Sequence, residues 1–206
     1  MSDIILVGGG DFAVEVHEIA DLVGHNVVGY LADSKGSLPL PHLGCISSIN
    51  SLGNVFEYYV IAIGAVDRAS LKRRAEILTY LFSQSFKPLS LVSPSAHVCR
   101  NVVIEQGVFV GHGATLGVGC CVKNFSLINT SAVLTHDVIV GERSIIAPCS
   151  FMAGRSSLGS DSLLGPKSLV LQGINIGSNV IVSFAASVSH DIPNNKTVLP
   201  PISRVV

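Results

Sequence analysis

The chain has 206 residues, of which 48% are hydrophobic, enough for one large domain or two small ones with a continuous core. Its 13 basic and 14 acidic side chains give a formal net charge of -1. The sequence contains no run of Lys or Arg that could bind along a phosphate backbone, so we predict no nucleic-acid partner. Because neither a signal-peptide pattern nor about 18 consecutive apolar residues occur, we predict a cytoplasmic protein without a membrane span.

The first 88 residues alternate short apolar runs with helical stretches. Residues 4–7 predict a strand, a glycine turn at residues 8–13 follows it, and residues 14–23 predict a helix. Two more strands are predicted at residues 26–31 and 58–63, and a second helix at residues 68–84. This order indicates a small parallel α/β sheet, a Rossmann-like half-domain over residues 1–88.

The glycine turn fits the dinucleotide-binding fingerprint G-x-G-x-x-G/A through Gly8, Gly10 and Ala13, and Asp33 follows the next strand. In dinucleotide enzymes an acid at this place binds a ribose. The region is long enough for one mononucleotide half but too short for a full dinucleotide fold, which disfavours NAD chemistry. A phosphate-bearing ligand at the helix N-terminus and a purely structural turn both stay open.

A repeat of six residues dominates the chain from Val92 onward. Every sixth residue is apolar at seventeen positions: Val92, Val98, Ile104, Val110, Leu116, Val122, Ile128, Leu134, Val140, Ile146, Met152, Leu158, Leu164, Val170, Ile176, Val182 and Val188. The residue four positions after each is small or β-branched. This period fits neither a β-sandwich nor a helical array. It predicts a solenoid over residues 89–206, in which three hexads close one triangular coil and successive coils stack about 4.8 Å apart.

A glycine often follows the apolar residue directly. This occurs at Gly111, Gly117, Gly141, Gly159, Gly165 and Gly177. We interpret these glycines as corner residues, because glycine tolerates the φ values that tight turns require.

The hexad pattern resembles the hexapeptide-repeat acyltransferases, whose left-handed triangular β-helix is built from [LIV]-[small]-x-x-[STAV]-x units. With the glycine turn before it, the chain resembles the sugar O- and N-acyltransferases related to sialic acid O-acetyltransferases and to enzymes that acetylate nucleotide-linked 4-amino sugars. The resemblance covers nearly the whole chain, through residues 12–16, 30–33, 62–64, 93–96, 129–131 and 190–193. It implies a homotrimeric acetyltransferase that moves an acetyl group from acetyl-CoA to an amino or hydroxyl group of a sugar in surface glycan biosynthesis.

Acyl transfer from a thioester needs a base, a group that orients the base, and donors for the developing oxyanion. The resemblance implies that His136 is the base and that Asp137 holds one tautomer of its imidazole. It places acceptor contacts at Gly10, Asp33, Gly64 and Asn129, and acetyl-CoA contacts, largely through backbone groups, at Gly154, Gly165, Phe184 and Ala185.

The sequence departs from this family in two places. Asp11-Phe12 stands where nucleotide-sugar members commonly carry Gly-His, which adds negative charge near the expected phosphate site. The closing G-x-P-A-K motif is replaced by residues 199–204, Leu-Pro-Pro-Ile-Ser-Arg. The first change disfavours an acceptor that carries a nucleotide. The second changes the residues that the family uses near the adenine end of CoA.

A metal site is the first alternative to acyl transfer by His136. His112 and His190 share a hexad slot with His136. His112 lies 24 residues before His136 and so on a different face, whereas His190 lies 54 residues after it, on the same face but three turns or about 14 Å away. Histidines so dispersed cannot share a zinc ion within one chain, and the five cysteines form no C-x-x-C pair, so we predict no metal site. The alternatives are a non-catalytic, ligand-binding β-helix scaffold and an acyltransferase for a non-sugar acceptor such as serine.

Overall fold

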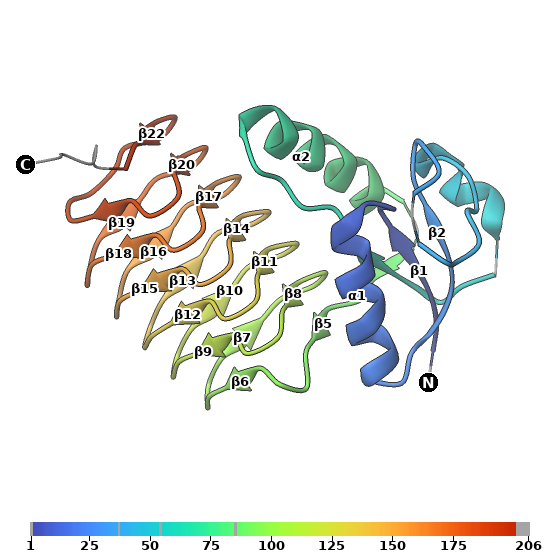
Figure 1. The fold of residues 1–206 in the computed structure, drawn as a ribbon, viewed down its shortest axis with the longest axis horizontal. Helices are drawn as coiled ribbons and strands as arrows, with labels where there is room; N and C mark the ends of the chain where they lie inside the picture. The colour runs from blue at the N-terminus through green and yellow to red at the C-terminus, as the bar shows by residue number, and fades with distance from the viewer. Residues whose placement is uncertain (1, 37, 54, 85, 201–206) are drawn as a thin grey trace, which may run out of the picture.

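The structure is a computed structural model that describes residues 2–36, 38–53, 55–84 and 86–200. It consists of a small α/β domain and a long three-sided coil of short strands, which lie side by side (Figure 1). The predicted boundary after residue 88 falls between β4 (Lys87–Pro88), the last strand of the α/β sheet, and β5 (Leu91–Val92), the first strand of the coil.

The α/β domain is a four-stranded parallel sheet in the order β2-β1-β3-β4. Its other elements are β1 (Asp3–Val7), α1 (Asp11–Leu22), β2 (Asn26–Leu31), the 3₁₀ helix η1 (Ile46–Leu52), β3 (Tyr58–Ile61) and α2 (Arg68–Phe82). Ile4 and Leu6 of β1 pack on the side of α1, whereas Ile5 and Val7 pack on the side of η1 and α2. Both faces of β1 are therefore buried, which explains its unbroken apolar run.

The elements predicted for this domain are present, with shifted ends. Helix α1 begins at Asp11, three residues before the predicted start, because Gly10 is an extended N-cap and the Asp11 carboxylate is favoured by the dipole of the first turn. Helix α2 begins at the predicted Arg68, after a capping box between Asp67 and Ser70. The third strand ends two residues earlier than predicted.

Among the described residues of the coil, eighteen two-residue strands form three parallel sheets. Sheet 1 contains β5, β8 (Phe109–Val110), β11 (Leu127–Ile128), β14 (Ile145–Ile146), β17 (Leu163–Leu164), β20 (Ile181–Val182) and β22 (Thr197–Val198). Sheet 2 contains β6 (His97–Val98), β9 (Thr115–Leu116), β12 (Val133–Leu134), β15 (Phe151–Met152), β18 (Leu169–Val170) and β21 (Ser187–Val188). Sheet 3 contains β7 (Val103–Ile104), β10 (Cys121–Val122), β13 (Ile139–Val140), β16 (Ser157–Leu158) and β19 (Asn175–Ile176).

The coil has the predicted repeat of three hexads. Residues pair with those eighteen positions later, as Leu127 pairs with Ile145, so each coil passes through sheets 1, 2 and 3 in turn. The last coil is shorter, because Ile181 pairs with Thr197, sixteen positions later. From Val108 to Ile192 the large aliphatic residues of the hexads form one continuous core with the small apolar residues. At the open first coil, Val98 is 40% exposed. Some buried serines at the small position are satisfied by the next coil, since the hydroxyls of Ser126 and Ser144 donate to the carbonyls of Gly141 and Gly159 at 2.7 Å. Others, such as Ser156, donate to a carbonyl of their own coil.

The interpretation of the corner glycines was wrong in its physical reason. The positive φ of each corner falls two residues later in the hexad, often on a non-glycine residue such as Asp137, whose φ is 58°. A Cβ at Gly117 would instead lie 2.6 Å from the backbone carbon of Thr135, and one at Gly141 would lie 2.6 Å from that of Gly159. These positions require glycine because the backbone of the next coil leaves no room for a Cβ atom.

The α/β domain packs on sheet 1. An outward apolar row on this sheet, Leu91, Phe109, Leu127, Ile145 and Leu163, belongs to the same buried cluster as the inner side of α1. The rings of Phe12 in α1 and Phe109 in β8 meet edge to face with centroids 5.0 Å apart. Within the described ranges, no helix is long and apolar enough to cross a membrane.

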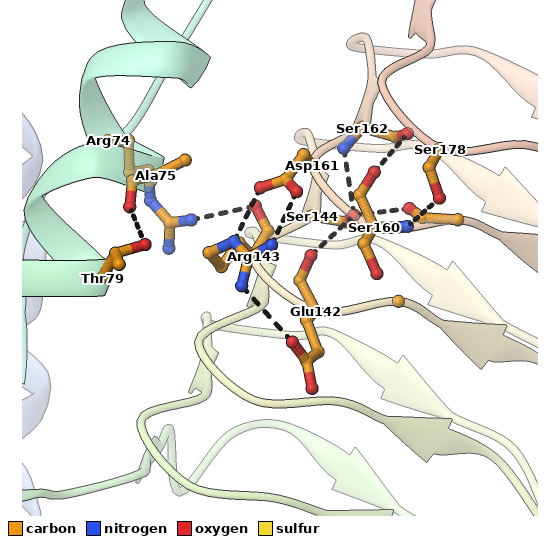
Figure 2. Close-up of polar contacts among 12 residues, drawn as sticks. Arg74, Ala75, Thr79, Glu142, Arg143, Ser144, Ser160, Asp161, Ser162 and Ser178 are labelled. Atoms are coloured by element: carbon orange, nitrogen blue, oxygen red, sulfur yellow. Dashed lines mark hydrogen bonds and ion pairs between the residues drawn. The ribbon is translucent and has the colours of Figure 1, made fainter. Parts of the chain in front are cut away.

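A buried arginine ties α2 to the coil. Arg74 is 2% exposed, and its guanidinium donates to the carbonyl oxygens of Ile63, Phe125 and Arg143 at 2.8, 2.7 and 3.0 Å. Figure 2 shows this group reaching from the helix to the corner where Arg143 forms a two-pronged ion pair with Asp161 at 2.7 Å. Burial lowers the pKa of Arg74 to about 10, so the side chain stays protonated at neutral pH.

Candidate active site

His136 and Asp137 lie at the corner between sheets 2 and 3, in the turn that joins β12 to β13. The left-handed backbone of Asp137 turns its carboxylate toward the preceding residue, and Oδ2 lies 3.0 Å from Nδ1 of His136. The two side chains are 49% and 58% exposed. A carboxylate on Nδ1 fixes the proton there and leaves Nε2 as the basic nitrogen of a half-exposed side chain.

Gly154 lies next to this imidazole. It occupies the same corner one coil later, and a Cβ added to it would come within 2.5 Å of Cε1 of His136 and closer still to Nε2. Of the residues predicted to contact acetyl-CoA, Gly154 is the one that the structure brings together with His136.

A groove of about 500 Å³ lies beside the contact of α1 with sheet 1, where the first turn of the helix and residues 64–66 face the coil. Its floor is apolar and includes Leu127, Ile145 and Leu163 from three successive coils. Its remaining lining residues are Asp11, Phe12, Glu15, Gly64, Ala65, Val66, Ser70, Asn129, Ala147, Pro148 and Pro166. The groove therefore opens between the two domains of one chain, along the corner between sheets 1 and 2, with two carboxylates on its helical wall.

The residues predicted to bind the acceptor lie in different places. Gly64 and Asn129 line the groove, and Gly10 caps the helix that forms its wall. The Asp33 carboxylate is outside this lining and pairs with Arg73 of α2 at 2.9 Å. The structure thus brings two of the four predicted residues into one cavity and gives Asp33 a different partner.

The residues predicted to contact acetyl-CoA divide between two corners of the coil. Gly165 lies between β17 and β18, and Phe184 and Ala185 lie between β20 and β21, so all three are at the corner between sheets 1 and 2. Phe184 is 66% exposed. Gly154 lies instead at the corner of His136, so sheet 2 separates the two groups within one chain.

The other histidines of this hexad slot are not near His136 in the way a metal site requires. His112 is at the corner between sheets 1 and 2, where its Nδ1 lies 2.9 Å from the hydroxyl of Ser93. In the described ranges, no group of three or more His, Cys, Asp or Glu residues could hold a metal ion. The contact that the structure shows for His136 is with the carboxylate of Asp137, at 3.0 Å from Nδ1.

Sequence reasoning missed Glu15 and Arg74. Glu15 lies one helical turn after Asp11, and this spacing of four residues was the available signal that both carboxylates share one face of α1. Arg74 gave no signal, because an arginine in an amphipathic helix is ordinarily exposed. Of the altered closing motif at residues 199–204, residues 201–204 lie outside the described residues.

Comparison with known proteins gives matches to both parts of the chain. Residues 3–79 match the family described as the PglD N-terminal domain. The acetyltransferase domain of PglB from Neisseria gonorrhoeae, solved with acetyl coenzyme A, is 26% identical with a TM-score of 0.86, over 95% of this chain and 94% of that one. PerB from Caulobacter crescentus, solved with CoA and GDP-perosamine, is 28% identical with a TM-score of 0.83, over 93% and 91% of the two chains.

WeeI from Acinetobacter baumannii shares the fold at 18% identity, with a TM-score of 0.77 over 94% of each chain. Together these matches confirm the predicted resemblance to hexapeptide-repeat sugar acetyltransferases. They also confirm the predicted fold, an α/β half-domain followed by a left-handed parallel β-helix, and the predicted class of acyl-CoA-dependent acetyltransferase.

Proposed function

We propose that this chain, similar over nearly its whole length to hexapeptide-repeat sugar acetyltransferases, transfers the acetyl group of acetyl-CoA to an amino group of a sugar in surface glycan biosynthesis. The observation that carries the proposal is the pairing of His136 with Asp137 at 3.0 Å on an exposed corner of the β-helix. The similar PglB and PerB structures, solved with acetyl coenzyme A and with CoA and GDP-perosamine, support acetyl-CoA as the donor and a sugar as the acceptor.

In the proposed reaction His136 acts as the general base. Its Nε2 removes the proton from the acceptor nitrogen as that nitrogen attacks the thioester carbonyl. The Nδ1 proton stays in its hydrogen bond to Asp137, which stabilises the imidazolium that forms. Collapse of the tetrahedral intermediate breaks the carbon–sulfur bond, and the imidazolium returns its proton to the departing CoA thiolate. No covalent enzyme intermediate is needed.

The groove between α1 and sheet 1 is the proposed acceptor site. Its volume of about 500 Å³ suits a small ligand, and its apolar floor suits the non-polar face of a sugar ring. Among the described residues, no cation forms an ion pair with Asp11 or Glu15. These carboxylates favour an acceptor that carries an amino group and disfavour a phosphate group beside α1.

A homotrimer is the assembly that completes this site. The groove and His136 lie at opposite edges of sheet 2, so one chain cannot bring them together. Three copies with sheet 2 facing a common axis would place the corner between sheets 2 and 3 of one copy beside the corner between sheets 1 and 2 of the next. The outward side chains Val133, Phe151 and Leu169 give sheet 2 an apolar surface for that contact, with Phe151 37% exposed.

The test is release of CoA thiol from acetyl-CoA with a panel of free amino sugars, nucleotide-linked amino sugars, sialic acids and serine. We expect turnover with an amino sugar in the wild type and its loss in His136→Ala. Acetyl transfer to serine alone would replace the sugar acceptor by an amino acid. A wild type that binds no CoA would instead identify the chain as a non-catalytic scaffold.

A further inference from the structure

The identity of residue 154 is not explained by the backbone of the β-helix. Gly154 is absent from the residues with positive φ, so its backbone conformation is open to any residue. It occupies the slot two positions after the inward aliphatic residue of its hexad. The same slot holds side chains as different as Val118, Pro166 and Phe184 in other coils, so the coil itself accepts large residues there.

What distinguishes position 154 is the imidazole of the preceding coil. A Cβ on Gly154 would overlap Nε2, lie 2.5 Å from Cε1 and lie 2.8 Å from Cδ2 of His136. The ring therefore lies over the bare Cα of Gly154 while its Nδ1 contacts Asp137. Any side chain at position 154 would displace the ring from this orientation.

The carboxylate of the pair has a matching glycine on the other side. Gly119 precedes Asp137 by one coil at the same corner, and a Cβ there would lie 2.5 Å from Oδ1 of Asp137. That oxygen is not the one that contacts His136, which is Oδ2. A side chain on Gly119 would therefore push the carboxylate from the side opposite to the imidazole.

We infer that Gly119 and Gly154 are positioning residues that act by having no side chain. Gly154 leaves room for the imidazole on the side of the following coil, and Gly119 leaves room for the carboxylate on the side of the preceding coil. This space allows the orientation in which Nδ1 of His136 contacts Asp137. The inference rests on the proposed function insofar as it makes His136 the base. The geometry of the pair is a separate matter and can be measured without any turnover.

The kinetic test compares Gly154→Ala with wild type, with His136→Ala and with the double variant. We expect Gly154→Ala to lower kcat/KM about 100-fold and to alter its pH dependence, because a misplaced base loses the gain from orientation. In the His136→Ala background the same substitution should have no further effect on the residual rate. A full additional loss there would mean that Gly154 acts on the substrates and not through His136, and would overturn the inference.

Gly113→Ala is the matched control for Gly119→Ala. Gly113 and Gly119 share a hexad slot and have positive φ values of 64° and 76°, so alanine strains the backbone equally at both. A Cβ on Gly113, however, meets only the hydroxyl of Ser131, at 3.4 Å. We expect both variants to lose similar stability and only Gly119→Ala to lose activity. Equal activity in the two variants would contradict the role of Gly119.

Ring NMR signals of His136, identified by their loss in His136→Ala, provide the readout that needs no activity. They should shift and titrate differently in Gly119→Ala and Gly154→Ala and stay unchanged in Gly113→Ala. Unchanged signals in the first two variants would overturn the positioning role. If instead these signals shift as expected while His136→Ala keeps full turnover, the proposed base is wrong and the positioning of the pair stands.

Discussion

Arg74 in α2 and Phe125 in the β-helix are joined by a buried hydrogen bond of 2.7 Å from the guanidinium Nη2 to the carbonyl oxygen. Phe125 has a left-handed φ of 58°, so its carbonyl belongs to a corner and not to a strand. Two further carbonyls, those of Ile63 and Arg143, accept from the same group. One side chain thus ties the α/β domain to two corners of the coil.

The loss of Arg74 should therefore destabilise the whole chain. Arg74→Ala leaves three carbonyl oxygens without this donor and opens a cavity, and we expect the free energy of unfolding to fall by about 3–5 kcal/mol. Chemical denaturation measures the change. Arg73→Ala is the neighbouring control, because that side chain is 60% exposed and pairs with Asp33 at the surface, so its loss should cost less than about 1 kcal/mol.

Substitutions of His136 and Asp137 should lower kcat to different extents, because the two residues have different roles. His136→Ala removes the proposed base and should lower kcat about 100- to 10,000-fold with little change in the thermal midpoint, because the side chain is half exposed. Asp137→Asn should cause a smaller loss of kcat, since the amide still occupies the space of the carboxylate but no longer stabilises an imidazolium. Steady-state kinetics with saturating acetyl-CoA checks both values. Equal rates in wild type and His136→Ala would reject the base.

The acidic wall of the groove should determine the KM for the acceptor. Glu15→Gln removes one of its two carboxylates, and we expect the KM for an amino sugar to rise about tenfold or more while that for acetyl-CoA stays unchanged. Glu15→Lys should have a larger effect on the same constant. Glu57→Gln, at an exposed glutamate next to β3 and outside the groove, is the matched control. A rise in both KM values, or an equal rise in the control, would refute this assignment.

Thiol labelling should distinguish two cysteines by their surroundings. A hydrogen bond with the Ser47 hydroxyl lowers the pKa of Cys45, which is exposed, whereas burial raises the pKa of Cys120. Since the thiolate is the reactive form, Cys45 should label at a lower pH than an ordinary thiol, and Cys120 should label only at high pH or after unfolding. Mass spectrometry of peptides from a pH series gives the order. Ser47→Ala should move the labelling of Cys45 to higher pH.

The fold could be predicted from the sequence to the extent that it repeats. Seventeen apolar residues at intervals of six determine the register, because each coil meets the same steric demands as the last. The corner glycines show where such reasoning stops. Their position was evident, but the cause, a close approach of the next coil to Gly117 or Gly141, depends on contacts eighteen residues apart that a local rule for turns does not contain.

The site could be predicted where the interacting residues are neighbours in the sequence. It could not be predicted where the partner is far away in the sequence. The motif around His136 and Asp137 predicts a pair on one corner, and the structure has them in contact. Asp33 was assigned from its place after a strand, yet it pairs with Arg73, which is 40 residues away in sequence. The groove itself comes from the docking of α1 on sheet 1, and no single segment of the sequence encodes that contact.

The central claim, that one copy supplies the groove and the next supplies His136, is tested most directly by mixing two impaired variants and measuring turnover at an acceptor concentration far below the KM of Glu15→Lys. Glu15→Lys damages the groove and His136→Ala removes the base, so a trimer assembled from equal amounts should regain about one quarter of the wild-type sites, one half times one half. A mixture of His136→Ala with His136→Asn, which damage the same corner, should regain none. If the first mixture never exceeds the sum of its two components, the site lies within a single chain and the account is contradicted.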